Sequence, residues 1–155
     1  MVIQRWQSVL LLIACTLMAC FTFLSLGQVQ TETVTYNFTS CGFSPEGIPT
    51  GGDMPAGIPT WILFCISLCS AILPFLAIFL FKRFRLQMNC CLFEVVLIIA
   101  AACFAGYYGY TEFPGVHCSW STLALAPLLA LAATIMAWNR IRRDRESIRS
   151  ANRLR

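Results

Sequence analysis

The side chain best suited to chemistry is Glu94, a carboxylic acid inside a long apolar stretch of the sequence. An ionisable group within a membrane-spanning segment is rare and is by default a candidate functional residue. Counted from Asn89, however, Glu94 lies only about 7.5 Å into its expected helix. That depth is within reach of the basic residues Arg5, Lys82 and Arg140. The sequence therefore favours a structural ion pair at the membrane boundary over a role in carrying protons.

The nine cysteines fall into two groups. Cys41 and Cys118 lie in the two segments expected outside the membrane, where an oxidising compartment favours a disulfide between them. A thiol oxidoreductase is the sharper alternative, but that chemistry usually needs a pair such as Cys-x-x-Cys, which the sequence lacks. The other seven cysteines lie within or at the ends of apolar stretches and are expected to act as small hydrophobic side chains.

Other catalytic and metal-binding patterns are missing from the sequence. Cys65 and Cys69 share a helical face, but the one histidine, His117, lies in a loop and no carboxylate completes a set of four ligands. No glycine-rich phosphate loop follows a strand, and one histidine cannot supply a Ser-His-Asp set or a two-histidine metal motif. Neither an enzyme nor a cofactor is expected.

The composition requires a membrane around these residues. Of the 155 residues, 58% are hydrophobic and 12% are charged, which leaves more apolar surface than a soluble fold of this size can bury. Four stretches are long enough to cross a bilayer as helices: residues 8–26, 60–81, 90–108 and 122–138. We expect an all-α membrane fold, in which the whole chain, residues 1–155, is one four-helix bundle.

The distribution of basic residues predicts the orientation of this bundle. All eleven Lys and Arg residues precede the first stretch, separate the second from the third, or follow the fourth. Positively charged loops next to membrane spans are retained in the cytoplasm. Both termini are therefore expected to be cytoplasmic, with residues 27–59 and 109–121 as the external loops.

The first external loop is expected to carry a small cap. Residues 33–39 alternate between apolar and polar side chains, with Val34, Tyr36 and Phe38 on one face, as in a half-buried strand. This face is expected to pack against Phe113 and Trp120 of the second loop. The remainder of the first loop is rich in Gly and Pro, which indicates turns.

Two prolines and a basic tail complete the pattern. Pro74 and Pro127 each lie within an expected span and are predicted to bend it. The tail, residues 139–155, is predicted to continue the fourth helix. Its basic stripe and the inner loop should contact anionic lipids of the inner leaflet rather than nucleic acid, because the tail has no aromatic residue to stack on bases. The residues of this basic membrane surface are Lys82, Arg83, Arg85, Arg142, Arg145, Arg149 and Arg153.

Three segments of the sequence carry a resemblance to a known family: residues 3–7 (IQRWQ), the inner loop around Phe81-Lys82 and Arg85-Leu86-Gln87, and the basic C-terminus. They resemble an uncharacterised family of small four-span proteins from Bacteroidetes, known only as a domain of unknown function (4293). The chain departs from that pattern at Arg83-Phe84, where the family usually has Asn-Arg. The resemblance implies a bacterial inner membrane and brings no activity.

The sequence leaves three functions open. The expected one is a non-enzymatic accessory or scaffold protein of the inner membrane, whose partners are the lipid bilayer and another membrane protein. The first alternative is a small proton-coupled transporter that uses Glu94. The second is a thiol oxidoreductase that faces the periplasm and uses Cys41 and Cys118.

Overall fold

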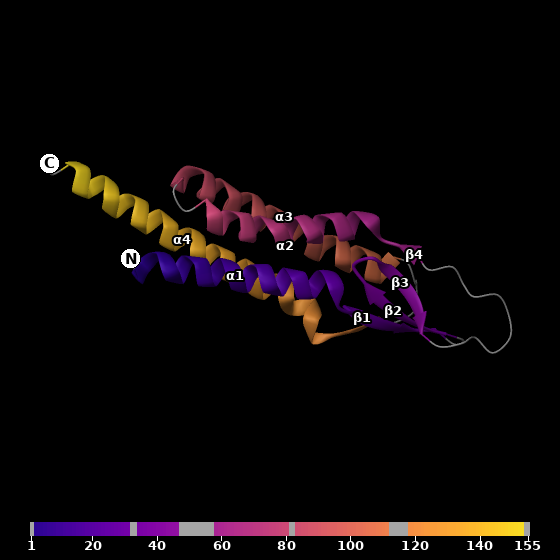
Figure 1. Cartoon of the computed structure of the whole chain (residues 1–155). Helices are drawn as coiled ribbons and strands as arrows, with labels where there is room; N and C mark the ends of the chain where they lie inside the picture. The colour runs from indigo at the N-terminus through magenta and orange to yellow at the C-terminus, as the bar shows by residue number, and fades with distance from the viewer. Residues whose placement is uncertain (1, 32–33, 47–57, 81–82, 112–117, 154–155) are drawn as a thin grey trace.

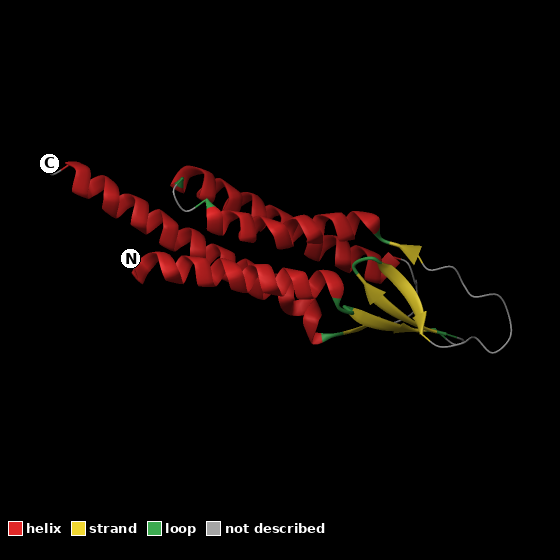
Figure 2. Cartoon of the chain, in the orientation of Figure 1, coloured by secondary structure: helices red, strands yellow, loops and turns green. Residues whose placement is uncertain are grey.

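The computed structural model describes residues 2–31, 34–46, 58–80, 83–111 and 118–153. Four long helices lie along one another, and a small antiparallel sheet adjoins one end of the bundle (Figures 1 and 2). The two termini lie at the opposite end (Figure 1). We call these two ends the sheet end and the basic end. The prediction of a mostly helical fold with a small cap is confirmed in these terms.

The four helices are α1 (Val2–Phe23), α2 (Trp61–Phe79), α3 (Phe84–Thr111) and α4 (Ala126–Arg153). Each is long and apolar enough to cross a membrane, which indicates a membrane protein. Helix α4 continues through the basic tail, as predicted. Helix α3 begins earlier than the predicted start at Cys90, and this shift changes the depth of every residue that follows.

The helices form a ring in which α1 packs against α2 and α4, and α3 packs against the same two helices. Each helix buries residues at alternating steps of three and four, which is the spacing of one helical face. On α3 this face runs from Gln87 through Cys91, Glu94 and Ile98 to Ala101. Helix α4 instead buries small side chains, at Ala126, Ala130, Ala133 and Ala137, which allow close approach of the neighbouring helices.

The two prolines have different roles. Pro74 lies buried inside α2, as the sequence predicted. Pro127 does not lie mid-helix, because the residues before it form a short 3₁₀ helix, η1 (Thr122–Leu125), and α4 begins only at Ala126. A proline in the first helical turn breaks no hydrogen bond of the helix. The Leu123 carbonyl, to which Pro127 cannot donate, accepts the Ala126 N–H instead.

The sheet has five strands, β1 (Gly27–Gln30), β2 (Thr35–Thr39), β3 (Gly42–Glu46), β4 (Ile58–Pro59) and β5 (Cys118–Trp120). Their order is β4-β3-β2-β1-β5, and every neighbouring pair is antiparallel. Strand β2 falls within the predicted residues 33–39. The segment of strand β3 was expected to form turns, and this expectation is wrong. The strand tolerates Pro45 because the described residues of β4 pair with Gly42 and Phe43, so no N–H donor is needed from Pro45 on that side.

Aromatic contacts hold the sheet together. Phe38 of β2 is fully buried, stacks on Phe43 of β3 with ring centroids 4.4 Å apart, and meets the edge of Trp120 of β5 at 6.0 Å. The expected packing of Phe38 against Trp120 is thus confirmed, and the expected partner Phe113 lies outside the described residues. The Ser40 hydroxyl donates to the Phe21 carbonyl of α1 at 3.1 Å, which fixes the sheet to the bundle.

Candidate functional site in the bundle core

A layer of polar side chains crosses the middle of the bundle between two apolar clusters. The cluster toward the sheet end includes Ala71, Ile98 and Ala133, and the cluster toward the basic end includes Ala77, Cys91 and Ala137. Three buried polar residues lie close to the boundary between these clusters, one on each of three helices. We call them the polar layer: Ser70 of α2, Glu94 of α3 and Thr134 of α4.

Glu94 is the ionisable residue of this layer, and it is 1% exposed. The Ser70 hydroxyl donates a 2.8 Å hydrogen bond to Glu94 Oε1. The other oxygen, Oε2, is buried and has no hydrogen-bond partner among the described residues. A buried carboxyl oxygen without a donor is uncommon, because burial without a hydrogen bond has a free-energy cost of about 1 to 3 kcal/mol.

The structure describes the side chain of one of the three basic residues expected to pair with Glu94 at the membrane boundary. Arg140 is exposed and makes no ion pair with Glu94, and the side chains of Arg5 and Lys82 lie outside the description. Because α3 begins at Phe84 rather than at Cys90, Glu94 lies about 15 Å along its helix. Its partner Ser70 is likewise central in α2, which spans Trp61–Phe79.

Helix α2 supplies the hydrogen-bond partner of Glu94, Ser70, which lies four residues before a proline. Pro74 has no N–H, so it cannot donate to the carbonyl of Ser70, four residues earlier. The hydroxyl of the same residue makes the hydrogen bond to Glu94. One turn toward the sheet end, Ser67 is also fully buried and donates to the Phe64 carbonyl of its own helix at 3.1 Å.

The remaining surroundings of Glu94 are small and weakly polar. Cys91, one turn earlier on α3, and Cys15 of α1 lie close enough to interact with it electrostatically. Thr134 of α4 is fully buried and donates to the Ala130 carbonyl at 2.9 Å. Hydroxyl groups that bond to their own backbone in this way are satisfied within the helix.

Two buried glutamines lie at the basic end of the core, and the sequence analysis named neither as a candidate site residue. Gln87 of α3 is buried two turns before Glu94, and its Oε1 has no hydrogen-bond partner among the described residues. Gln7 of α1 is buried and donates to Asp144 of α4. The signal for Gln87 is its spacing: it shares the helical face of Cys91 and Glu94.

The predicted disulfide between Cys41 and Cys118 is not supported by the structure. Cys41 is a free, exposed thiol in the turn between β2 and β3. Cys118 pairs with Val29 of β1, and β1 lies between β5 and β2. Two strand spacings amount to roughly 9.6 Å, which exceeds the Cα separation that a disulfide bridges. The turn at Cys41 lies a further strand length away.

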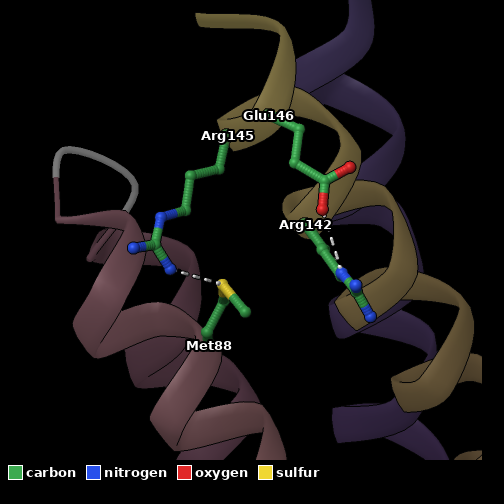
Figure 3. Close-up of polar contacts among 4 residues, drawn as sticks. All are labelled: Met88, Arg142, Arg145 and Glu146. Carbon is green, nitrogen blue, oxygen red and sulfur yellow. Dashed lines mark hydrogen bonds and ion pairs between the residues drawn. The ribbon is translucent and has the colours of Figure 1, made fainter. Parts of the chain in front are cut away.

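Arg142 and Arg145 of the tail make different contacts (Figure 3). Arg142 pairs with Glu146 at 3.1 Å and lies over the Trp138 ring. Arg145 extends toward α3, where its Nη1 donates to the Sδ of Met88 at 3.8 Å. Arg83 and Arg85 lie at the start of α3 and are exposed. Arg149 and Arg153 belong to α4. Their side chains and that of Lys82 lie outside the description.

Within the described residues, no three His, Cys, Asp or Glu side chains lie together as a set of metal ligands. The comparisons with known proteins agree with the sequence resemblance. The family model described as "Domain of unknown function (DUF4293)" matches residues 3–154. No curated protein matches the chain.

Proposed function

Because the chain belongs to the DUF4293 family, whose description gives no activity, we propose a function from the buried polar layer itself. The protein is a small proton-coupled membrane transporter, and Glu94 is the group that binds and releases the proton. The observation that carries this proposal is the position of Glu94 midway along the bundle, with Oε2 lacking a described partner. At the membrane boundary, the same residue would have suggested only an ion pair.

The physical argument concerns the charge of a carboxyl group in apolar surroundings. An ionised carboxylate without a cation is costly to enclose between helices, so the enclosed group carries a proton. When water reaches Oε2 it can accept the proton, and a cation bound there compensates the negative charge left on the carboxylate. A carboxyl that binds a proton and a cation in turn couples the movement of one to the movement of the other.

Further buried polar groups lie toward each end of the bundle from Glu94, and their burial supports the proposal. Toward the basic end, α3 carries Gln87, whose Oε1 lacks a described partner. Toward the sheet end lie Ser67 of α2 and Thr60, whose hydroxyl donates to the Ser40 carbonyl at 2.7 Å. We propose that protons reach Glu94 past these groups.

The proposal includes an orientation. The basic end, with both termini, faces the cytoplasm, and the sheet faces the periplasm across a bacterial inner membrane. It is supported by the clustering of all eleven Lys and Arg residues in segments that belong to the basic end. Among the residues that the structure describes at the sheet end, the charged one is the acid Glu46 of β3.

Transport by purified protein in liposomes tests the function. A pH gradient is imposed, a trapped fluorescent pH indicator is read, and Na⁺, K⁺ or tetraphenylphosphonium is added outside. We expect at least one of these cations to drive proton movement with the wild type, and Glu94→Gln to abolish it. Glu46→Gln, which alters an exposed acid of the sheet, is the matched control and should retain the response.

Two outcomes oppose the proposal. If none of the three cations moves protons, or if Glu94→Gln behaves as the wild type does, Glu94 is a structural residue. The accessory or scaffold function then becomes the better explanation, and purification from native membranes should yield a stoichiometric partner protein. Mixed disulfides of Cys41 with a periplasmic protein would instead favour the thiol oxidoreductase.

A further inference from the structure

The proline inside α2 leaves a second oxygen atom at the level of the buried acid. In a helix the carbonyl of one residue accepts the N–H of the residue four positions later, so Pro74 withholds the donor that the Ser70 carbonyl would use. Both residues are buried inside α2. The Ser70 hydroxyl meanwhile donates to Glu94 Oε1 at 2.8 Å. The residue that contacts the acid therefore also carries a carbonyl without its helical donor.

The oxygen atoms of this contact could all accept a positive charge. Glu94 Oε2 is buried and has no hydrogen-bond partner among the described residues. The Ser70 hydroxyl gives its one proton to Oε1, and its oxygen can still act as an acceptor. A buried polar atom without a partner is uncommon, and a bound ion is one explanation of it. One cation would satisfy the carboxylate, the carbonyl and the hydroxyl together.

The composition of this oxygen set decides the class of cation. Carboxylate, carbonyl and hydroxyl oxygens are hard ligands, which suit alkali and alkaline-earth ions better than soft transition metals. Glu94 supplies a single negative charge, which balances a monovalent ion but leaves a divalent ion with excess charge in the core. Ser70 is fully buried and Glu94 is 1% exposed, so a bulky organic cation does not fit between them.

Two observations favour Na⁺ among the alkali ions. The Ser70 hydroxyl and Glu94 Oε1 lie only 2.8 Å apart, and neighbouring ligands approach each other more closely around a small ion than around K⁺. Backbone carbonyls freed where a membrane helix is interrupted are also known ligands of Na⁺. Pro74 creates such a carbonyl without ending α2, which continues to Phe79.

We propose that Glu94 and Ser70 form a binding site for Na⁺, with Glu94 Oε2 as the charged ligand and the carbonyl and hydroxyl oxygens of Ser70 as neutral ligands. This inference rests on the proposed function, since it names the cation that exchanges with the proton of Glu94. A proton and Na⁺ cannot occupy Oε2 together, so binding of the ion releases the proton. Pro74 is a positioning residue, because it keeps the Ser70 carbonyl available to the ion.

Binding of radioactive Na⁺ to the purified full chain in nonionic detergent tests the site. We expect saturable binding to the wild type, with only weak competition by excess K⁺. Pro74→Ala restores an N–H that can bond to the Ser70 carbonyl and leaves Glu94 unchanged. It should weaken Na⁺ binding roughly tenfold or more, because one ligand of the ion is lost. Pro127→Ala is the matched control, since this proline lies in the first turn of α4, and it should bind Na⁺ as the wild type does.

Several results would overturn the site: no saturable binding of Na⁺ to the wild type, unchanged affinity in Pro74→Ala, or equal loss in Pro127→Ala. Equal competition by K⁺ overturns the assignment to Na⁺. If Pro74→Ala does not fold, Ser70→Ala removes the hydroxyl ligand instead and should weaken binding. Its control is Thr22→Val, because the buried Thr22 hydroxyl donates to the Met18 carbonyl of its own helix at 2.8 Å, and unchanged binding in Ser70→Ala opposes the site.

The liposome assay distinguishes this site from the proposed function. Binding of Na⁺ in detergent without any cation-driven proton movement in liposomes supports the site and opposes the transporter. Proton movement driven by K⁺ or tetraphenylphosphonium, without binding of Na⁺, supports the transporter and overturns the site.

Discussion

The hydroxyl of Ser70 donates to a carboxyl oxygen of Glu94 at 2.8 Å, and this contact links α2 to α3 midway along the bundle. The carbonyl of the same serine lacks its usual helical donor because Pro74 follows four residues later. One residue thus presents two oxygen atoms in the core, and one of them already contacts the buried acid. The residue whose carbonyl lacks a helical donor in α2 is thus also the hydrogen-bond partner of the buried acid in α3.

The first prediction measures this coupling. Ser70→Ala leaves both carboxyl oxygens of Glu94 without a described partner, so it should lower the free energy of unfolding by about 1 to 2 kcal/mol. In a Glu94→Ala background the same change should have a smaller effect, with a coupling of about 1 kcal/mol. Thermal unfolding in detergent, followed by tryptophan fluorescence, provides the measurement. Ser67→Ala is the matched control, since Ser67 bonds only to its own helix, and equal coupling there would contradict the contact.

The second prediction concerns the junction of α3 with the sheet. A Cβ atom added at Gly109 would lie 2.7 Å from the Cη2 and Cζ2 atoms of Trp120. Gly109→Ala should therefore displace the Trp120 ring and weaken its edge contact with Phe38, lowering the free energy of unfolding by about 1 to 3 kcal/mol. Tryptophan emission should shift as the ring moves.

A neighbouring glycine supplies the control for this experiment. A Cβ added at Gly106 meets nothing within 4 Å. Gly106→Ala should therefore be neutral or stabilising by up to about 1 kcal/mol, because alanine favours a helix more than glycine does. If both substitutions have the same effect, helix propensity and not the Trp120 ring decides the outcome at Gly109.

The third prediction concerns the external thiol. Cys41 is free and exposed at the sheet end, so a membrane-impermeant maleimide should modify it in intact cells without a reductant. Cys118→Ser provides the background, so that one external cysteine is followed. Cys65, Cys69 and Cys103 are also exposed, but they lie on the outer surface of α2 and α3, where lipid should protect them. If Cys41 reacts only after reduction, it has a disulfide partner.

The fourth prediction tests the proposed orientation. A reporter fused after Arg155 should be active only if it works in the cytoplasm, because the positively charged segments retain that end there. A reporter inserted near Gly52, outside the described residues, should be active only if it works outside the membrane. Activity of both reporters on the same side would contradict four crossings.

The helices could be predicted from the sequence because their signal is local. Some twenty apolar residues in succession require a spanning helix whatever lies next to them, and all four were found. The sheet depends on contacts between distant segments, such as Val29 with Cys118. A three-residue strand like β5 has no periodic pattern of its own, so its pairing could not be inferred.

The candidate site depended on where one helix begins. The sequence analysis identified Glu94 but took the third apolar stretch to begin at Cys90, after Arg85 and Gln87. The structure includes both residues in the helix, since long polar side chains are tolerated at the end of a span. This difference of about two turns moves Glu94 from a charged boundary to the centre. Its contact with Ser70, 24 residues earlier, is a matter of packing that periodicity does not reveal.

The pairing of β5 with β1 has a consequence for the order in which the chain assembles. Strand β1 follows α1 directly, but the Ser119 hydroxyl that donates to the Gln28 carbonyl belongs to a residue synthesised 91 positions later. In a growing chain with the proposed topology, the outer edge of β1 stays open until both α2 and α3 have been inserted. An open strand edge invites pairing with other chains. The edge can therefore close only after the middle of the protein has crossed the membrane. A chain that fails to insert α3 keeps this strand edge available to chaperones and proteases.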